Sequence, residues 1–290
     1  MPEPNAVVTL DVLHTGVMWG GYVTMNFWAK SVATGVFLLG PLLLGRELKK
    51  RPELRLWIPL LALAFTGLTL LFTVLDLHQP FRFWHMFVWP HLTSTINLGS
   101  WLLSAYSGLL VLLLYAAYRK LERLYDLLFY PTALIAFGAT IYTAGIMGQA
   151  TAREIWQAPT EVAQTLLTAV VAGSALLLFL RLTDEERLLL GKVLGLSSFV
   201  ALVIAVVELV FAHQKSEEGG YIVHLLLQGE LGPIYLGGLA AGLLFPALLA
   251  AVSVGSGSTR PLRFAAVVSL VGLWAFKHAW LIAPQLIPLS

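Results

Sequence analysis

The sequence predicts an all-α integral membrane protein with eight transmembrane helices. Apolar residues make up 58% of the 290 positions and charged residues only 12%, and the mean hydropathy is +0.80. A soluble domain of this length needs a far more polar surface. Eight separate segments are also long and apolar enough to span a bilayer, which takes about 20 residues in a helix.

The predicted spans follow one another with short loops between them. Pro41, Pro59, Pro131 and Pro246 fall in or near them and are expected to kink the helices without preventing them. The spans cover residues 19–44, 56–75, 98–118, 124–147, 158–180, 188–211, 231–254 and 262–281.

Basic residues divide unevenly between the loops. The odd-numbered loops carry twelve and the even-numbered loops three. By the positive-inside rule the odd loops face the cytoplasm, and both termini and the even loops face outward across the cytoplasmic (inner) membrane. The N-terminal stretch has no basic region followed by a cleavage site and does not resemble a signal peptide.

Composition also excludes several classes of partner and cofactor. The net charge of +2 is too small to suggest nucleic-acid binding, and the absence of cysteine excludes an iron–sulfur cluster ligated by this chain. All seven histidines fall at or near the predicted outer face. None lies deep in a span, so a haem held by two axial histidines is disfavoured. The histidines mark the outer face as a place of chemistry or docking, although each ring alone also suits an interfacial anchor.

A row of polar side chains runs down the first span from its outer mouth to the middle of the membrane, because residues four apart share a helix face. An ammonium at that depth costs at least about 2.5 kcal/mol, so Lys30 is expected to have a partner or to transfer protons. The alternative is that it only joins two helices. The row consists of His14, Tyr22, Asn26, Lys30 and Thr34.

Two further sets of polar residues lie in the spans. Thr93, Asn97, Ser100, Ser104 and Ser107 share one face of the third span. Small polar residues on one face favour close helix packing, with a water-lined path beside Lys30 as the alternative.

Glu161, Glu208 and Lys277 lie inside the outer ends of the fifth, sixth and eighth spans. Snorkelling to the interface explains each separately. Glu208, one turn before His213, also suits a proton relay.

The second loop and the start of the third span, residues 76–103, combine chemistry-bearing residues beside the membrane surface. Asp76, His78 and Arg82 lie close together among further histidines, several aromatic residues and two prolines. Aromatic side chains can stack on a flat ring, and Asp or His can exchange protons with a ring carbonyl or hydroxyl. An interfacial aromatic belt alone would not need the three polar residues.

This segment also carries a resemblance to a known family. LDLHQPFRFWHMFVWP followed by TSTINLGSWLL is similar to the Leu-Asp-Leu-x-x-Pro-x-Arg-Phe-Trp motif, with its trailing Ser-x-x-x-x-Gly-x-Trp, of the polysulfide reductase membrane-anchor (NrfD/PsrC) family. Pro80, Arg82 and Trp84 are the motif residues here. The first span, WGGYVTMNFWAKSVATGVFLL, and the run YTAG from Tyr142 resemble that family's first helix and its Tyr-Thr-Gly motif. Over the last four spans the resemblance to the family rests on topology alone.

The resemblance implies two four-helix bundles, residues 1–150 with the quinone site and 151–290, without haem or iron–sulfur cluster of their own. It implies that menaquinone or ubiquinone binds near the outer face. A four-cluster ferredoxin-like iron–sulfur subunit would dock there and exchange electrons with a molybdopterin catalytic subunit. By position, Asn26 and Tyr142 correspond to residues that contact the quinone head. Asn26 stands where some members have histidine, so His14, His78 or Asp76 would supply the proton.

We therefore expect a quinone-reactive anchor subunit that is not catalytic alone. The alternative is a secondary transporter that binds a small anion at Lys30, although the two halves show no convincing internal repeat. The predicted quinone-binding residues are His14, Tyr22, Asn26, Asp76, His78 and Tyr142, and the predicted proton path consists of Lys30, Ser100, Ser104 and Glu208.

Overall fold

The computed structural model describes residues 16–287 except 46–50, 92, 152 and 154. Over this part of the chain it contains helices and turns and no strand. Within the described residues, eight helices are long and apolar enough to cross a membrane, which confirms the prediction of an all-α protein with eight membrane-spanning helices. The crossing helices are α1 (Gly21–Leu38) with α2 (Gly40–Leu44), α3 (Pro52–Asp76), α5 (Thr95–Tyr118), α6 (Glu122–Gln149), α7 (Ala158–Leu177), α8 (Asp184–Lys215), α10 (Gly232–Leu239) with η2 (Ala240–Leu244) and α11 (Phe245–Ser256), and α12 (Arg260–Ile282) with η3 (Ala283–Leu286).

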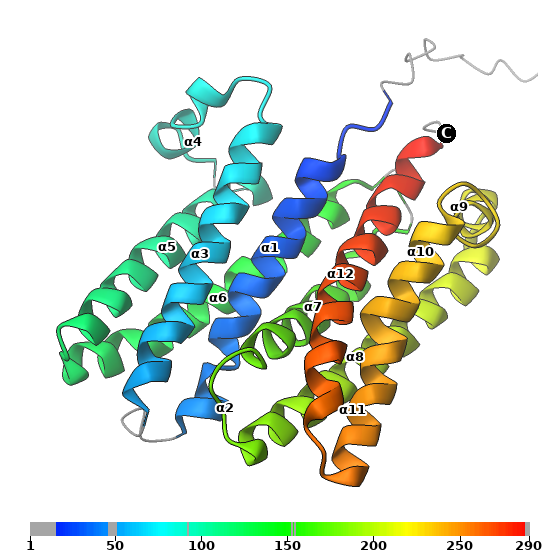
Figure 1. The fold of residues 1–290 in the computed structure, drawn as a ribbon. Helices are drawn as coiled ribbons and strands as arrows, with labels where there is room; N and C mark the ends of the chain where they lie inside the picture. The colour runs from blue at the N-terminus through cyan, green and yellow to red at the C-terminus, as the bar shows by residue number, and fades with distance from the viewer. Residues whose placement is uncertain (1–15, 46–50, 92, 152, 154, 288–290) are drawn as a thin grey trace, which may run out of the picture.

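Successive spans run in opposite directions, so their connections alternate between two ends of the molecule (Figure 1). The first end, which we call the α4 end, carries the short helices η1 (Pro80–Arg82), α4 (His85–Val88) and α9 (Glu217–Leu227). The other, the α2 end, carries α2 and the turn from α11 to α12. The odd-numbered loops therefore share the α2 end. Which end faces the cytoplasm stays a prediction from the basic residues.

Helix α1 lies at the centre of the packing. It contacts α3, α6, α7 and α12. On one side of it α5 packs against both α3 and α6, and on the other side α8 packs against both α7 and α11. The division into two four-helix bundles stays a prediction.

The α1–α7 crossing depends on small residues. A Cβ added at Gly35 would lie 1.8 Å from the carbonyl oxygen of Ala169, and one at Gly173 would lie 2.2 Å from the carbonyl carbon of Gly35. The two backbones therefore touch, which only side chains as small as hydrogen permit. This contact is one of those that join the first four spans to the last four, together with α6–α7 and α1–α12.

The seventh span contains a π-helical turn at η2. Pro246 has no N–H, so the carbonyl of Gly242 lacks its usual partner four residues later. The Ser269 hydroxyl of α12 donates to that carbonyl at 3.3 Å, and the N–H of Phe245 bonds to the carbonyl of Ala240 five residues back. The proline is thus accommodated by a bulge and by a neighbouring helix, as membrane helices require.

The surface of the helical region is apolar and its interior holds many polar side chains. Leu127, Leu134 and Leu196 are at least 67% exposed, whereas Ser198 and Ser269 are fully buried. This distribution is the reverse of that in a soluble protein, where large exposed apolar patches are rare. It is the arrangement that a hydrocarbon environment requires.

Candidate functional site

Tyr22, Asn26 and Lys30 lie on one face of α1 and lead from the α4 end into the interior. Tyr22 is 54% exposed, Asn26 9% and Lys30 3%. Thr34 continues the row, but its hydroxyl donates to the carbonyl of Lys30 at 2.9 Å. Lys30 is therefore the last residue of the row whose polar group has no hydrogen-bond partner among the described residues.

Asn26 joins α1 to α3. Its Nδ2 donates to the backbone carbonyl of Thr69 at 3.1 Å and to the hydroxyl of Thr73. A carbonyl oxygen only accepts, so the chemistry requires the amide nitrogen to face α3. The Oδ1 receives no hydrogen bond from any of the described residues, which makes Asn26 an acceptor toward anything that binds beside it.

Lys30 rests on the ring of Tyr142. Its Nζ lies 4.1 Å from the centroid of that ring and 5.1 Å from the centroid of Phe27. Within the described residues the buried Nζ has no hydrogen-bond partner and no carboxylate beside it. A desolvated cation–π contact contributes about 2 kcal/mol and does not replace the hydrogen bonds of an ammonium. The ammonium of Lys30 is therefore buried without a hydrogen-bond acceptor among the described residues.

The Tyr142 ring is placed by a glycine that the sequence interpretation did not single out as a site residue. A Cβ added at Gly99 of α5 would lie 2.2 Å from the Tyr142 ring carbon Cε2. Gly99 thus leaves the room against α5 that the Tyr142 ring occupies. The available signal was the glycine of the trailing motif that follows the second loop.

The end of α3, which packs on Tyr22 through Phe72, adds acid–base groups at the α4 end. The rings of Tyr22 and Phe72 lie 6.1 Å apart, and Asp76 ends α3 one turn beyond Phe72. Asp76 is half-buried and close enough to His78 for an electrostatic interaction, and His78 is exposed. The sixth predicted quinone-binding residue, His14, lies outside the described residues.

A polar row on α3 also escaped the sequence interpretation. Thr66, Thr69, Thr73 and Asp76 follow at spacings of three, four and three residues, and the two middle residues bind Asn26. The same periodicity that revealed the row on α1 was the signal for this one.

The family-motif residues lie in the cap formed by η1 and α4. Pro80 begins η1, while Arg82 and Trp84 are exposed. The rings of Trp84 and His85 lie 4.1 Å apart. Asn97 of α5 donates to the carbonyl of Met86 at 2.7 Å, so this cap is fixed onto α5 at the α4 end.

The remaining predicted proton-path residues lie in different places. Ser100 donates to the carbonyl of Ile96 at 3.0 Å and lies 3.3 Å from the sulfur of Met86, and Ser104 is exposed on α5. Their role in proton transfer stays a prediction.

Glu208 belongs to a second polar cluster. The described groups that act on its carboxylate are Glu161, Lys277, Thr160 and Gln164, and Lys30 is not among them. The snorkelling expected for Glu161 and Lys277 is wrong, because Glu161 is fully buried and Lys277 is 9% exposed. They form an ion pair at 3.6 Å. Each charge finds its partner across the helix interface, which removes the need to reach water.

Tyr22, Asn26, Lys30 and Tyr142 form a first polar cluster. It has the components of a site for a flat ring with oxygen substituents. It offers aromatic rings at Tyr22 and Tyr142, an acceptor at Asn26 and an ammonium at Lys30, and the Asp76–His78 pair lies at the end of the adjacent helix α3. Such groups hold and exchange protons with carbonyl and hydroxyl oxygens. Within the described residues no group of three His, Asp or Glu side chains is placed to hold a metal ion.

Comparison with known proteins gives the family. Residues 11–288 match the family described as "Polysulphide reductase, NrfD". The tetrathionate reductase C chain of Salmonella typhimurium (strain LT2) is 31% identical over 140 residues, which are 45% of this chain and 40% of that relative. The match thus spans less than half the length of the curated relative. Since the family covers nearly the whole chain, the protein belongs to the polysulphide reductase NrfD family.

Proposed function

We propose that the chain is the quinone-reactive membrane subunit of a multi-subunit oxidoreductase. The observation that carries the proposal is Lys30, a buried ammonium without an acid partner among the described residues, held over Tyr142 one turn below Asn26. A cation is kept at such a depth for function more often than for stability. The oxygen atoms of menaquinone or ubiquinone supply the hydrogen-bond acceptors that the Lys30 ammonium lacks among the described residues.

The site residues have complementary roles in the proposal. Tyr142 and Lys30 donate to one oxygen of the ring, and Tyr22 covers the ring near the α4 end. Asn26, whose N–H groups are occupied by α3, accepts a hydrogen bond and so favours the hydroxyl of the reduced form. Interconversion of quinol and quinone moves two electrons and two protons, and Asp76 with His78 passes the protons to or from water.

The electrons require a partner, because the sequence contains no cysteine to ligate a cluster. We assign the partner as a four-cluster ferredoxin-like iron–sulfur subunit that docks at the α4 end and connects to a molybdopterin catalytic subunit. The match to a subunit of tetrathionate reductase supports a complex of this kind. Family membership also favours this function over a transporter of small anions.

The proposal is tested by Tyr142→Phe in the intact complex. Loss of the hydroxyl should lower turnover with a soluble quinone analogue by about tenfold to a hundredfold, which is the scale of one hydrogen bond to a reacting oxygen. Assembly and oxidation of an artificial electron donor at the catalytic subunit should be unchanged.

The matched control is Tyr130→Phe. Tyr130 lies on the same helix, α6, and is 61% exposed, so its hydroxyl should not affect turnover. Equal quinone-coupled activity in wild type and Tyr142→Phe would remove Tyr142 from the site.

A further inference from the structure

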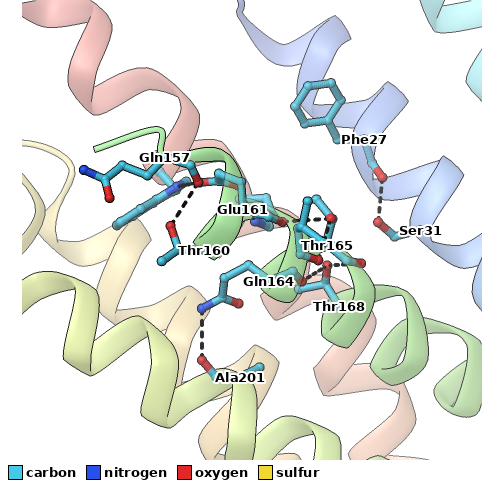
Figure 2. Close-up of polar contacts among 12 residues, drawn as sticks. Phe27, Ser31, Gln157, Thr160, Glu161, Gln164, Thr165, Thr168 and Ala201 are labelled. Carbon is cyan, nitrogen blue, oxygen red and sulfur yellow. Dashed lines mark hydrogen bonds and ion pairs between the residues drawn. The ribbon is translucent and has the colours of Figure 1, made fainter. Parts of the chain in front are cut away.

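The second polar cluster lies among four helices and is separate from the quinone site. Glu161 of α7 accepts a hydrogen bond from the indole of Trp280 at 2.6 Å and pairs with Lys277, both on α12. Glu208 of α8 lies two turns beyond Ala201, to which Gln164 of α7 donates, and is close enough to Glu161 and Lys277 for an electrostatic interaction. Tyr235 of α10 is close enough to Glu208 for the same kind of interaction. Figure 2 shows Glu161 with Thr160 and Gln164 on the same helix, with Gln164 directed toward α8, where its Nε2 donates to the carbonyl of Ala201 at 3.1 Å.

The charges in the cluster do not balance when all groups are ionised. Glu161 and Lys277 already neutralise each other, and Glu208 adds a second carboxylate without a second cation among the described groups that act on it. An unpaired carboxylate in a low-dielectric interior costs several kcal/mol. If the cluster served only to join α7 to α12, the ion pair of Glu161 and Lys277 would suffice and Glu208 would not be needed.

Several buried polar atoms of the cluster also lack hydrogen-bond partners among the described residues, although two of them, Oε2 of Glu161 and Nζ of Lys277, form the ion pair at 3.6 Å. The full set is Oε2 of Glu161, Oε1 of Gln164, Oε1 of Glu208, the hydroxyl of Tyr235 and Nζ of Lys277. Glu161, Gln164 and Tyr235 are each at most 1% exposed. Buried polar atoms are nearly always satisfied, so these side chains need a donor and an acceptor that the described residues do not supply.

We propose that Glu161, Glu208 and Lys277 form an internal proton-binding site, in which the two carboxylates share one proton opposite the single ammonium, with water completing the hydrogen bonds. One added proton makes the cluster neutral. A metal cation fits less well, because the ammonium of Lys277 already occupies the position of the counter-charge.

Among the residues whose side chains the structure describes, no other charge is placed to neutralise Glu208. On α9, Glu218 is paired with Arg153 at 3.6 Å, and the segment from η2 to α11 contains no titratable residue. Glu161 lies three residues from the start of α7, about 5 Å along the helix at the usual rise. The site therefore exchanges protons through the α4 end, without passing Lys30.

Infrared difference spectroscopy of the purified full chain in nanodiscs tests the proposal. At neutral pH the wild type should show the carbonyl stretch of one protonated, buried carboxylic acid. Both Glu208→Gln and Glu161→Gln should lose the band, since one remaining carboxylate paired with Lys277 needs no proton. The control Glu185→Gln, an exposed acid on the same helix as Glu208, should keep it.

Two further variants separate this site from a structural ion pair. Lys277→Met should keep the band to more alkaline pH, because the carboxylates lose their counter-charge, and Lys277→Arg should behave as wild type. The proposal is overturned by a wild type without the band, by a band that survives both Gln variants, or by a band that sodium ions abolish at constant ionic strength. None of these readouts involves quinone, so they leave the proposed function untouched.

Discussion

At the scale of residues, the unusual feature of the molecule is a buried lysine whose ammonium has no counter-charge among the described residues. Lys30 is buried, and the described residues give its ammonium aromatic faces and no carboxylate. Arg55, by contrast, lies beside Tyr125 and also pairs with Asp126 at 3.2 Å. The structural cation Arg55 therefore has a carboxylate as its counter-charge, whereas Lys30 in the candidate site has none among the described residues.

This contrast leads to a prediction about Lys30→Met. Removal of an unpaired buried ammonium should raise the thermal midpoint Tm of the purified chain, because the desolvation cost disappears. Quinone-coupled turnover should fall by about a hundredfold, the scale of a lost proton donor. Both are measured on one preparation.

Lys192→Met provides the comparison, since Lys192 is exposed on α8 and should change neither quantity. A Lys30→Met protein that loses stability together with turnover would show that Lys30 is structural.

At the scale of elements, the eight spans are predictable from the sequence because each is a continuous apolar segment long enough to cross a bilayer. It does not predict the π-helical turn at η2, which depends on a hydroxyl from α12 reaching the carbonyl that Pro246 leaves free. It also misses α9, an amphipathic helix of eleven residues beside the membrane ends. Both features follow from contacts between segments, which a single-segment hydropathy pattern does not contain.

The α1–α7 crossing gives a prediction at this scale. Gly35→Ala should destabilise the protein by about 1–3 kcal/mol, because the added methyl would overlap the carbonyl of Ala169 and force the two helices apart. Thermal unfolding in detergent, followed by circular dichroism, measures the change.

Gly67→Ala on α3 is the control. Apart from the backbone of its own helix, no atom of the described residues lies within 4 Å of a Cβ at Gly67, so the variant should be neutral or more stable by about 0.5–1 kcal/mol. Equal midpoints for the two variants would mean that the close crossing is absent in the membrane.

At the scale of the whole molecule, the candidate site combines features that sequence reveals to different degrees. The row Tyr22, Asn26 and Lys30 is predictable because one helix contains it. The contact of Lys30 with Tyr142 and the pairing of Glu161 with Lys277 join segments more than a hundred residues apart. Periodicity carries no information about such pairs, which is why snorkelling was the wrong expectation for Glu161 and Lys277.

The orientation of the molecule is tested by single-cysteine labelling, for which the chain needs no prior replacement because it contains no cysteine. Gln79→Cys, beside His78 at the α4 end, should react in intact cells with a thiol reagent that does not cross membranes. Arg119→Cys at the α2 end should react only after lysis. The reverse pattern would place the proposed docking face in the cytoplasm.

The central claim is that a quinone binds between α1 and α6, and photochemical labelling with a reactive quinone analogue tests it most directly. After illumination of the purified complex, mass spectrometry should find the label in peptides covering residues 21–34 of α1 and 138–149 of α6, with excess native quinone suppressing it. Label confined to peptides from α8 to α12, or label that native quinone does not displace, would contradict the claim.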